Sequence, residues 1–217
     1  MSTHPIWRLT EDDAPAAGEL LARAFAVDPI HCYALPGVTA VERAERLAPY
    51  FVTAVRYGCR FGEAWAVGAA PGELAGVGWW APMPEAEFTD ERIAAVNPTP
   101  FSPDLQAVLA RVMELELPVD DILAGLLPRH HRHLAQLGVD PACQGQGFGR
   151  VLLAKFLTDA VADRVPLCLW TATPANVAFY RGAGMELVAE GAAEGDRPAW
   201  WAFGTPEPAP TEENSRG

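Results

Sequence analysis

The stretch Leu134–Gly149, which reads LAQLGVDPACQGQGFG, decides the fold of this 217-residue chain. Its apolar first half predicts a strand that ends at Val139, and Asp140-Pro141 predicts a turn. Three glycines then follow at alternate positions, and we expect a helix from Arg150. Such a loop before a helix gathers unpaired backbone N–H groups at the positive end of the helix dipole. The segment therefore predicts an anion site of the kind that binds a pyrophosphate.

Two common nucleotide-binding motifs do not fit this loop. A P-loop requires G-x-x-x-x-G-K-[ST], whereas Gly149 is followed by Arg150-Val151. A dinucleotide fingerprint requires G-x-G-x-x-G and an acidic residue after the next strand. Here the spacing is G-x-G-x-G, and no acid ends the next predicted strand, Leu167–Thr171. Both ligand classes are therefore disfavoured.

The spacing Gln144-x-x-Gly147-x-Gly149 resembles the pyrophosphate-binding signature [Q/R]-x-x-G-x-[G/A] of the GNAT superfamily of N-acetyltransferases. Further on, NVAFY at 176–180 resembles the family's N-x-x-[F/A]-Y segment, and YRGAGM at 180–185 resembles its Y-x-x-x-G-F ending. The likeness covers about residues 132–187 and extends more weakly to the N-terminal helices.

Within the superfamily the chain is most similar to the puromycin N-acetyltransferase type. LLARAFAVDP at 20–29 and TATPANVAFYRGAGM at 171–185 carry this likeness. One position departs from it: similar members often have a Glu near the end of the strand after the loop helix, where this chain has Trp170. The resemblance therefore does not extend to substrate specificity.

The remaining pattern predicts an α/β domain over residues 1–204 with one central sheet. The resemblance implies a single GNAT-like domain, with a mixed, mostly antiparallel sheet flanked by helices. We expect strands at 6–9, 63–67, 74–80, 134–139, 167–171, 186–189 and 199–203, and helices at 10–26, 40–57, 103–115, 120–127, 150–164 and 174–182. Pro49 should kink or divide the second helix, Pro82 and Pro84 should end the third strand, and 29–37 should form a loop.

Composition restricts the classes of partner. The chain has 16 basic and 28 acidic residues and a formal charge of −12, so nucleic acid or an anionic membrane is a poor partner and a cationic acceptor suits it better. Its four cysteines lie apart, without the spacing of a metal site. The N-terminus does not have the pattern of a secretory leader and no apolar run reaches about 18 residues, so we expect a cytoplasmic protein. We also expect a monomer or a homodimer. The stretch 205–217, rich in Pro and Glu, predicts a disordered tail.

The resemblance implies acetyl-CoA as the cofactor and assigns residues to its parts. The backbone of Leu137, Gly138 and Val139 would pair with the pantetheine arm, and the Val139 N–H would polarise the thioester carbonyl as an oxyanion hole does. The residues expected to cradle the pyrophosphate are Gln144, Gly145, Gln146, Gly147, Phe148, Gly149 and Arg150. Asn176 and Phe179 complete the cofactor contacts, with Asn176 as a hydrogen-bonding group.

Tyr180 is the candidate general acid. The coenzyme A thiolate leaves with a pKa of about 8.5, and a phenol with a pKa of about 10 can protonate it. The alternative is a core aromatic residue whose hydroxyl is capped by a neighbour. His133 is the candidate base, because family members have a Glu at that position and an imidazole with a pKa of about 6.5 suits the task. A hydrogen-bonded structural histidine is the alternative.

The sequence gives less information about the binding site of the acceptor amine. The candidate substrate-binding residues are Asp28, His31, Tyr33, Trp79, Trp80 and Trp170. Each tryptophan has the alternative of being simply part of the core, and Trp79 and Trp80 must point to opposite faces of their strand.

The function predicted is N-acetylation of a primary amine of a small molecule by direct attack, without a metal. Two alternatives stay open: an acyl-CoA-binding regulatory module without turnover, and acetylation of a protein N-terminus or lysine. Aromatic candidates for the pocket and the likeness to antibiotic-modifying enzymes favour a small molecule.

Overall fold

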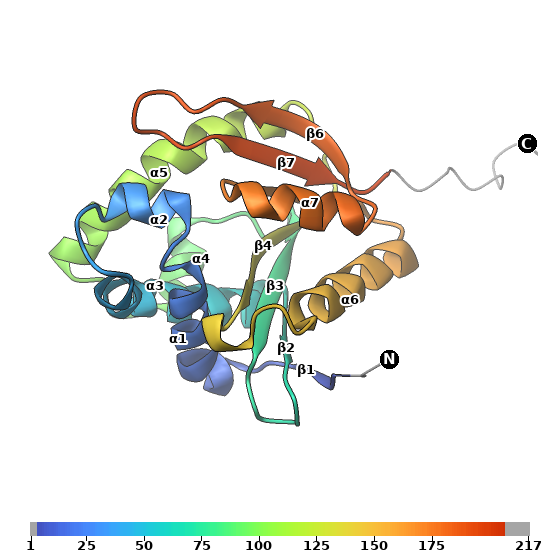
Figure 1. The fold of residues 1–217 in the computed structure, drawn as a ribbon, viewed down its shortest axis with the longest axis horizontal. Helices are drawn as coiled ribbons and strands as arrows, with labels where there is room; N and C mark the ends of the chain where they lie inside the picture. The colour runs from blue at the N-terminus through green and yellow to red at the C-terminus, as the bar shows by residue number, and fades with distance from the viewer. Residues whose placement is uncertain (1–3, 207–217) are drawn as a thin grey trace, which may run out of the picture.

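A seven-stranded sheet forms the centre of the molecule in the computed structural model, which describes residues 4–206 (Figure 1). The strand order is β1-β2-β3-β4-β5-β7-β6, and every neighbouring pair is antiparallel except β4 with β5. The strands are β1 (Ile6–Arg8), β2 (Glu63–Val67), β3 (Gly76–Met83), β4 (His131–Val139), β5 (Leu167–Thr171), β6 (Glu186–Gly191) and β7 (Trp200–Gly204). The predicted mixed, mostly antiparallel sheet is confirmed.

Helices cover both faces of the sheet. They are α1 (Ala14–Phe25), α2 (Pro29–Ala34), α3 (Ala40–Phe61), α4 (Asp90–Val96), α5 (Pro103–Ala124), α6 (Phe148–Asp163) and α7 (Pro174–Gly182). Helices α1 and α3 pack on one face in a core cluster that contains Trp79, whereas α6 packs on the other face with Trp80. The two tryptophans therefore point to opposite faces, as their adjacency predicted. Figure 1 shows α2 and α5 side by side, and apolar residues of both share one cluster.

Strand β4 is irregular in two ways that shape the site. Trp79 lies opposite Gln136 and Trp80 opposite Leu134, so Ala135 is an extra residue that forms a β-bulge. Strands β4 and β5 are paired only at Arg132↔Leu167 and His133↔Cys168. Beyond His133, therefore, one edge of β4 has no strand partner among residues 4–206.

The segment predicted as a loop after Asp28 is instead the short helix α2. Asp28 is its N-cap, because the side chain accepts a hydrogen bond from the Ile30 N–H at 2.9 Å. Pro29 stands in the first turn, where its missing N–H is not needed. Asp-Pro therefore starts a helix here as well as ending the previous one.

The prolines interrupt these elements less than the sequence predicted, although β3 does end just before Pro84. Pro49 lies inside the continuous helix α3, and Pro118 lies inside α5, so the two helices expected at 103–115 and 120–127 are one. Burial of one face of each helix offsets the lost backbone hydrogen bond. Pro82 lies within β3. Strand β2 stops pairing with β3 at Trp80, so beyond Trp80 this edge of β3 needs no N–H donor and tolerates a proline. Helix α4 was not predicted.

Between residues 4 and 206 no helix is both long and apolar enough to cross a membrane. Thr205, the first residue of the predicted tail, is bound to the sheet, since its N–H donates to the Leu167 carbonyl at 2.9 Å. The tail predicted to be disordered lies, from residue 207, outside the described residues.

Candidate active site

The loop between β4 and α6 has the backbone that its glycines predicted. Gly145 and Gly147 have φ of 76° and 92°, and Gly147 is the N-cap of α6. A Cβ at either position would meet nothing within 4 Å, so glycine is required for the left-handed backbone rather than for space. Within residues 4–206, the N–H groups of residues 144–149 have no hydrogen-bond acceptor. The loop therefore fits an anionic group such as a pyrophosphate.

The loop is held at its base by Asp140. Arg23 of α1 donates two hydrogen bonds to Asp140 Oδ2, at 2.9 and 2.6 Å. The other oxygen accepts the Ala142 N–H at 3.0 Å. The anion loop is thus fixed to the N-terminal helix.

The free edge of β4 presents backbone groups next to this loop. The Asp140 N–H donates to Ala75 at 2.9 Å, on the β3 side. Because N–H directions alternate along a strand, the N–H groups of Val139 and Leu137 point away from β3, toward the free edge. The Val139 carbonyl points the same way and accepts a hydrogen bond from Gln144 Nε2 at 3.3 Å. Two strand donors are therefore available to an extended ligand.

Gly149 lies over the same edge in the first turn of α6. A Cβ there would lie 3.4 Å from Val139 Cγ2, 3.7 Å from Phe179 Cζ and 3.8 Å from Leu137 Cδ2. Phe148 is buried in the core and Arg150 is exposed. The start of α6 therefore packs against both α7 and the β4 edge at this residue.

Tyr180 of α7 is buried, with 6% of its surface exposed, and its ring packs against Phe179 and Phe203. Its hydroxyl makes no hydrogen bond to any of residues 4–206, so it is not the capped core tyrosine of the alternative interpretation. Burial raises the pKa of Tyr180, and the nearby negative charge of Asp28 raises it further. The phenol therefore keeps its proton well into alkaline pH.

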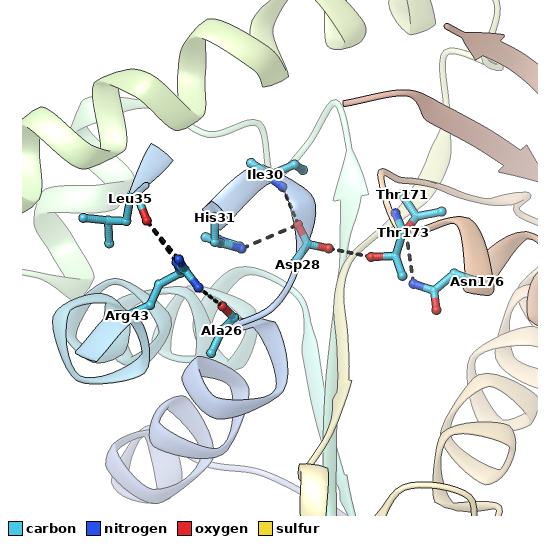
Figure 2. Close-up of polar contacts among 9 residues, drawn as sticks. All are labelled: Ala26, Asp28, Ile30, His31, Leu35, Arg43, Thr171, Thr173 and Asn176. Atoms are coloured by element: carbon cyan, nitrogen blue, oxygen red, sulfur yellow. Dashed lines mark hydrogen bonds and ion pairs between the residues drawn. The ribbon is translucent and has the colours of Figure 1, made fainter. Parts of the chain in front are cut away.

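Asp28 connects this tyrosine's helix to the acceptor-side helices, as Figure 2 shows. Its Oδ2 accepts the Thr173 hydroxyl at 2.8 Å. Thr171 Oγ1 accepts both the Thr173 N–H at 3.2 Å and the Asn176 amide at 3.1 Å. The start of α7 is thereby tied to the N-terminus of α2.

His133 faces the acceptor side of the sheet because of the bulge at Ala135. Its strand partner Ala81 belongs to the α1–α3 cluster, and Gln136 bonds Trp79 of the same cluster. Burial, and then the neighbouring His131, lower the pKa of His133 to about 4. The imidazole is therefore neutral at neutral pH and is a weaker base than the ordinary value predicted.

The six predicted acceptor residues do not form one group. Asp28 and His31 lie together, and Tyr33 and Trp170 pack around the α2–α5 cluster. Trp79, 2% exposed, donates to Gln136 Oε1 at 2.9 Å and is a core residue. Trp80 lies on the opposite face under the Arg132 guanidinium, 3.9 Å from the ring centre.

Sequence reasoning missed two acids on α5. Its buried residues include Val112, Leu115, Val119 and Leu123, and Glu116 lies within that stripe, one turn before Asp120. Burial, together with other carboxylates, raises the pKa of Glu116 to about 8 and that of Asp120 to about 6. The sequence does contain a signal for Glu116, an acidic residue inside an apolar helical stripe. Because the helix was predicted as two separate helices, the stripe was not recognised.

Comparison with known proteins supports the same interpretation. A model of the acetyltransferase (GNAT) family matches residues 58–185. The fold is similar to a Corynebacterium glutamicum structure described as histone acetyltransferase HPA2 and related acetyltransferase, at 18% identity over 96% of this chain and 99% of that chain, with a TM-score of 0.66. The fold is also similar to that of a mosquito arylalkylamine N-acetyltransferase-like protein, at 12% identity over 94% of this chain and 99% of that chain, with a TM-score of 0.58. A third similar structure is that of a Drosophila melanogaster polyamine N-acetyltransferase that forms N-acetylagmatine, at 15% identity over 93% of this chain and 99% of that chain, with a TM-score of 0.56. At these identities the likeness is one of fold.

Proposed function

The chain belongs to the acetyltransferase (GNAT) family of acyl-coenzyme-A-dependent N-acyltransferases, and on that premise we propose that it transfers the acetyl group of acetyl-CoA to a primary amine of a small molecule. One observation carries the proposal: an unpaired β4 edge and an anion-binding loop lie beside a buried tyrosine whose hydroxyl is free. Acetyl-CoA, when bound, supplies the activated acyl group.

The residues that would hold this cofactor are those of the loop and the strand edge. The N–H groups of residues 144–149 suit the pyrophosphate, with the α6 dipole adding positive potential. The Val139 and Leu137 N–H groups suit the pantetheine amides and the thioester oxygen, where a fixed donor stabilises developing negative charge. Phe179 of α7 lies close to Gly149 at that edge, and Asn176 of the same helix donates to Thr171 Oγ1.

In our proposal Tyr180 holds the proton that the departing thiolate requires. Its raised pKa keeps the phenol protonated, so it can donate at neutral pH. His133, neutral and on the acceptor face, accepts a hydrogen bond from the attacking nitrogen. An amine with a pKa of about 10.4 is neutral only about once in 10³ at pH 7, so orienting that fraction is useful. Asp28 is a positioning residue, because its oxygens bond Ile30 and Thr173.

A small-molecule acceptor is supported by the two amine acetyltransferases of similar fold and by the chain's net negative charge. The puromycin-type likeness remains a prediction from residues 20–29 and 171–185. Trp170, the position that departs from it, packs between α2 and α5 and belongs to the acceptor side. A cytoplasmic location and a monomer or homodimer remain predictions as well.

Release of the coenzyme A thiol tests the proposal. The enzyme is incubated with acetyl-CoA and a panel of primary amines, polyamines and peptides that carry a free N-terminus or lysine. We expect thiol release that depends on a small amine. Binding of acetyl-CoA without turnover on any amine would favour the regulatory module, and turnover on peptides alone would favour a protein acetyltransferase.

A further inference from the structure

His4, which precedes the first strand, lies against the anion loop between β4 and α6. Its Nε2 is 3.2 Å from the carbonyl oxygen of Gln146, 142 residues further along the chain. A carbonyl oxygen only accepts hydrogen bonds, so Nε2 carries the ring proton and donates it. The imidazole also packs on Phe148, with 4.1 Å between the ring centres. His4 therefore contacts both neighbours of Gly147, the N-cap of α6.

The sheet and α6 hold His4 in this place. The carbonyl of the next residue, Pro5, accepts the Gly68 N–H at 3.2 Å. Ile6 then begins β1, which pairs with β2, and its side chain packs in the apolar cluster that contains Phe148. His4 itself is half-buried. The imidazole thus reaches the loop from a strand whose position is fixed on two sides.

The hydrogen bond from His4 sets the direction of the Gly147 N–H. The Gln146 carbonyl and the Gly147 N–H belong to one trans peptide group, in which they point in opposite directions. Because the carbonyl is bound to His4, the N–H is turned away from the imidazole, and it has no acceptor among residues 4–206. It is therefore directed to the side of the loop on which an anion can bind.

The loop has little else to hold this peptide group. Gly147 has no Cβ to restrict its backbone, and a Cβ there would meet nothing within 4 Å. Within residues 4–206, His4 is the only residue outside the β4–α6 segment that forms a hydrogen bond with residues 144–149. A peptide group that turned over would direct the Gln146 carbonyl, with its partial negative charge, at a bound phosphate.

We propose that His4 is a positioning residue for the cofactor: its contacts with Gln146 and Phe148 keep the Gly147 N–H directed at the pyrophosphate of acetyl-CoA. The inference rests on the proposed function, which supplies this cofactor. A donor that is fixed before the ligand binds avoids the cost of ordering it during binding. His4 therefore increases the affinity for coenzyme A without touching the reacting atoms.

The first test measures binding and needs no turnover. Titration calorimetry of coenzyme A into His4→Phe, which keeps an aromatic ring on Phe148 but loses the donor, should give a Kd about three- to tenfold higher than wild type, the range of one hydrogen bond. His4→Gln, whose amide nitrogen lies about as far along the side chain as Nε2, should restore most of the affinity. His130→Phe is the matched control: this exposed histidine contacts Glu85 at the other end of β4 and should leave Kd unchanged.

The second test separates the pyrophosphate from the rest of the cofactor. S-acetylpantetheine carries the same thioester as acetyl-CoA but ends before the phosphates. His4→Phe should raise KM for acetyl-CoA with little change in kcat, and should leave kcat/KM for S-acetylpantetheine as in wild type. A structural role of His4 would lower kcat/KM for both donors alike.

Three outcomes decide between the claims. A Kd for coenzyme A that is the same in wild type and His4→Phe, or an equal loss for the two acetyl donors, would overturn the inference and leave the proposed function intact. Recovery in His4→Gln together with a loss confined to acetyl-CoA would support it. A wild-type protein that does not bind coenzyme A would contradict the proposed function, and the inference with it.

Discussion

The Thr173 hydroxyl donates a hydrogen bond of 2.8 Å to Asp28 Oδ2, joining two segments that are 145 residues apart in the chain. Asp28 starts α2 and Thr173 starts α7, so this contact connects the acceptor-side helices with the helix that carries Asn176 and Tyr180 (Figure 2). Thr173 does not cap α7 with its side chain, so the hydroxyl serves the contact with Asp28 alone. The position of Tyr180 therefore depends on the N-terminal part of the chain.

Changing Asp28 to Asn should move the alkaline limb of the kcat–pH profile to lower pH. The Asp28 charge raises the pKa of Tyr180, and without it the phenol loses its proton more easily. The profile is followed upward from pH 8 to the highest pH at which the enzyme stays folded, because the raised pKa of Tyr180 places this limb far into the alkaline range. Thr173→Val tests the hydrogen bond separately and should lower kcat, whereas Thr173→Ser should restore it. An alkaline limb that stays in place in Asp28→Asn would remove the electrostatic link.

Tyr180→Phe should lower kcat by about 10²-fold or more, the range for loss of a general acid, with little change in KM for acetyl-CoA. The ring and its contacts with Phe179 and Phe203 are kept, so folding should not suffer. Tyr57→Phe is a matched control: that hydroxyl donates to the Ala86 and Glu87 carbonyls and should affect stability only. Full turnover of Tyr180→Phe would require another proton donor.

Gly147→Ala should raise KM for acetyl-CoA by about tenfold, because moving the residue out of the left-handed region misdirects the loop N–H groups. Gly72 provides a close control. It has φ of 88° against 92° for Gly147, and neither would place a Cβ within 4 Å of another atom. Both changes should destabilise the fold by roughly 1–2 kcal/mol. If Gly72→Ala raised this KM equally, the effect would be one of stability.

His133→Gln should lower kcat/KM by about tenfold at every pH from 5.5 to 8, parallel to wild type. The pKa of His133 is lowered to about 4, so the imidazole is neutral throughout this range and its titration lies below it. A rate measurement against pH with one amine decides the matter. A break near 6.5 that disappears in the variant would show an ordinary imidazole instead.

The segment from Leu134 to Gly149 could be predicted because its signals are local: an apolar strand, a turn and glycines at positions that need φ above zero. The bulge at Ala135 has no such signal, since neither Gly nor Pro marks it, yet it decides which face His133 occupies. Glu116 was missed because it falls in the gap between the two helices predicted at 103–115 and 120–127, whereas tertiary packing carries α5 through Pro118 as one helix. Local chemistry could thus be predicted for the cofactor side, while the acceptor side depends on contacts between distant segments.

Glu116→Gln should stabilise the protein increasingly as the pH rises from 5 to 8. The pKa of Glu116 is about 8 in the folded chain against an ordinary 4.5, so between these values the folded state keeps a proton that the unfolded state releases. The stability of wild type therefore falls as the pH rises through this window, and the variant lacks the group that causes the fall.

Each kcal/mol of stability corresponds to about 2–4 °C in Tm for a domain of this size. Thermal unfolding should show curves that coincide near pH 5 and separate by about 4 °C or more at pH 8. Asp120, whose pKa of about 6 gives a similar but narrower dependence, is present in both proteins and cancels in the comparison. Parallel curves at all pH values would mean that Glu116 is ionised and already compensated in the folded chain.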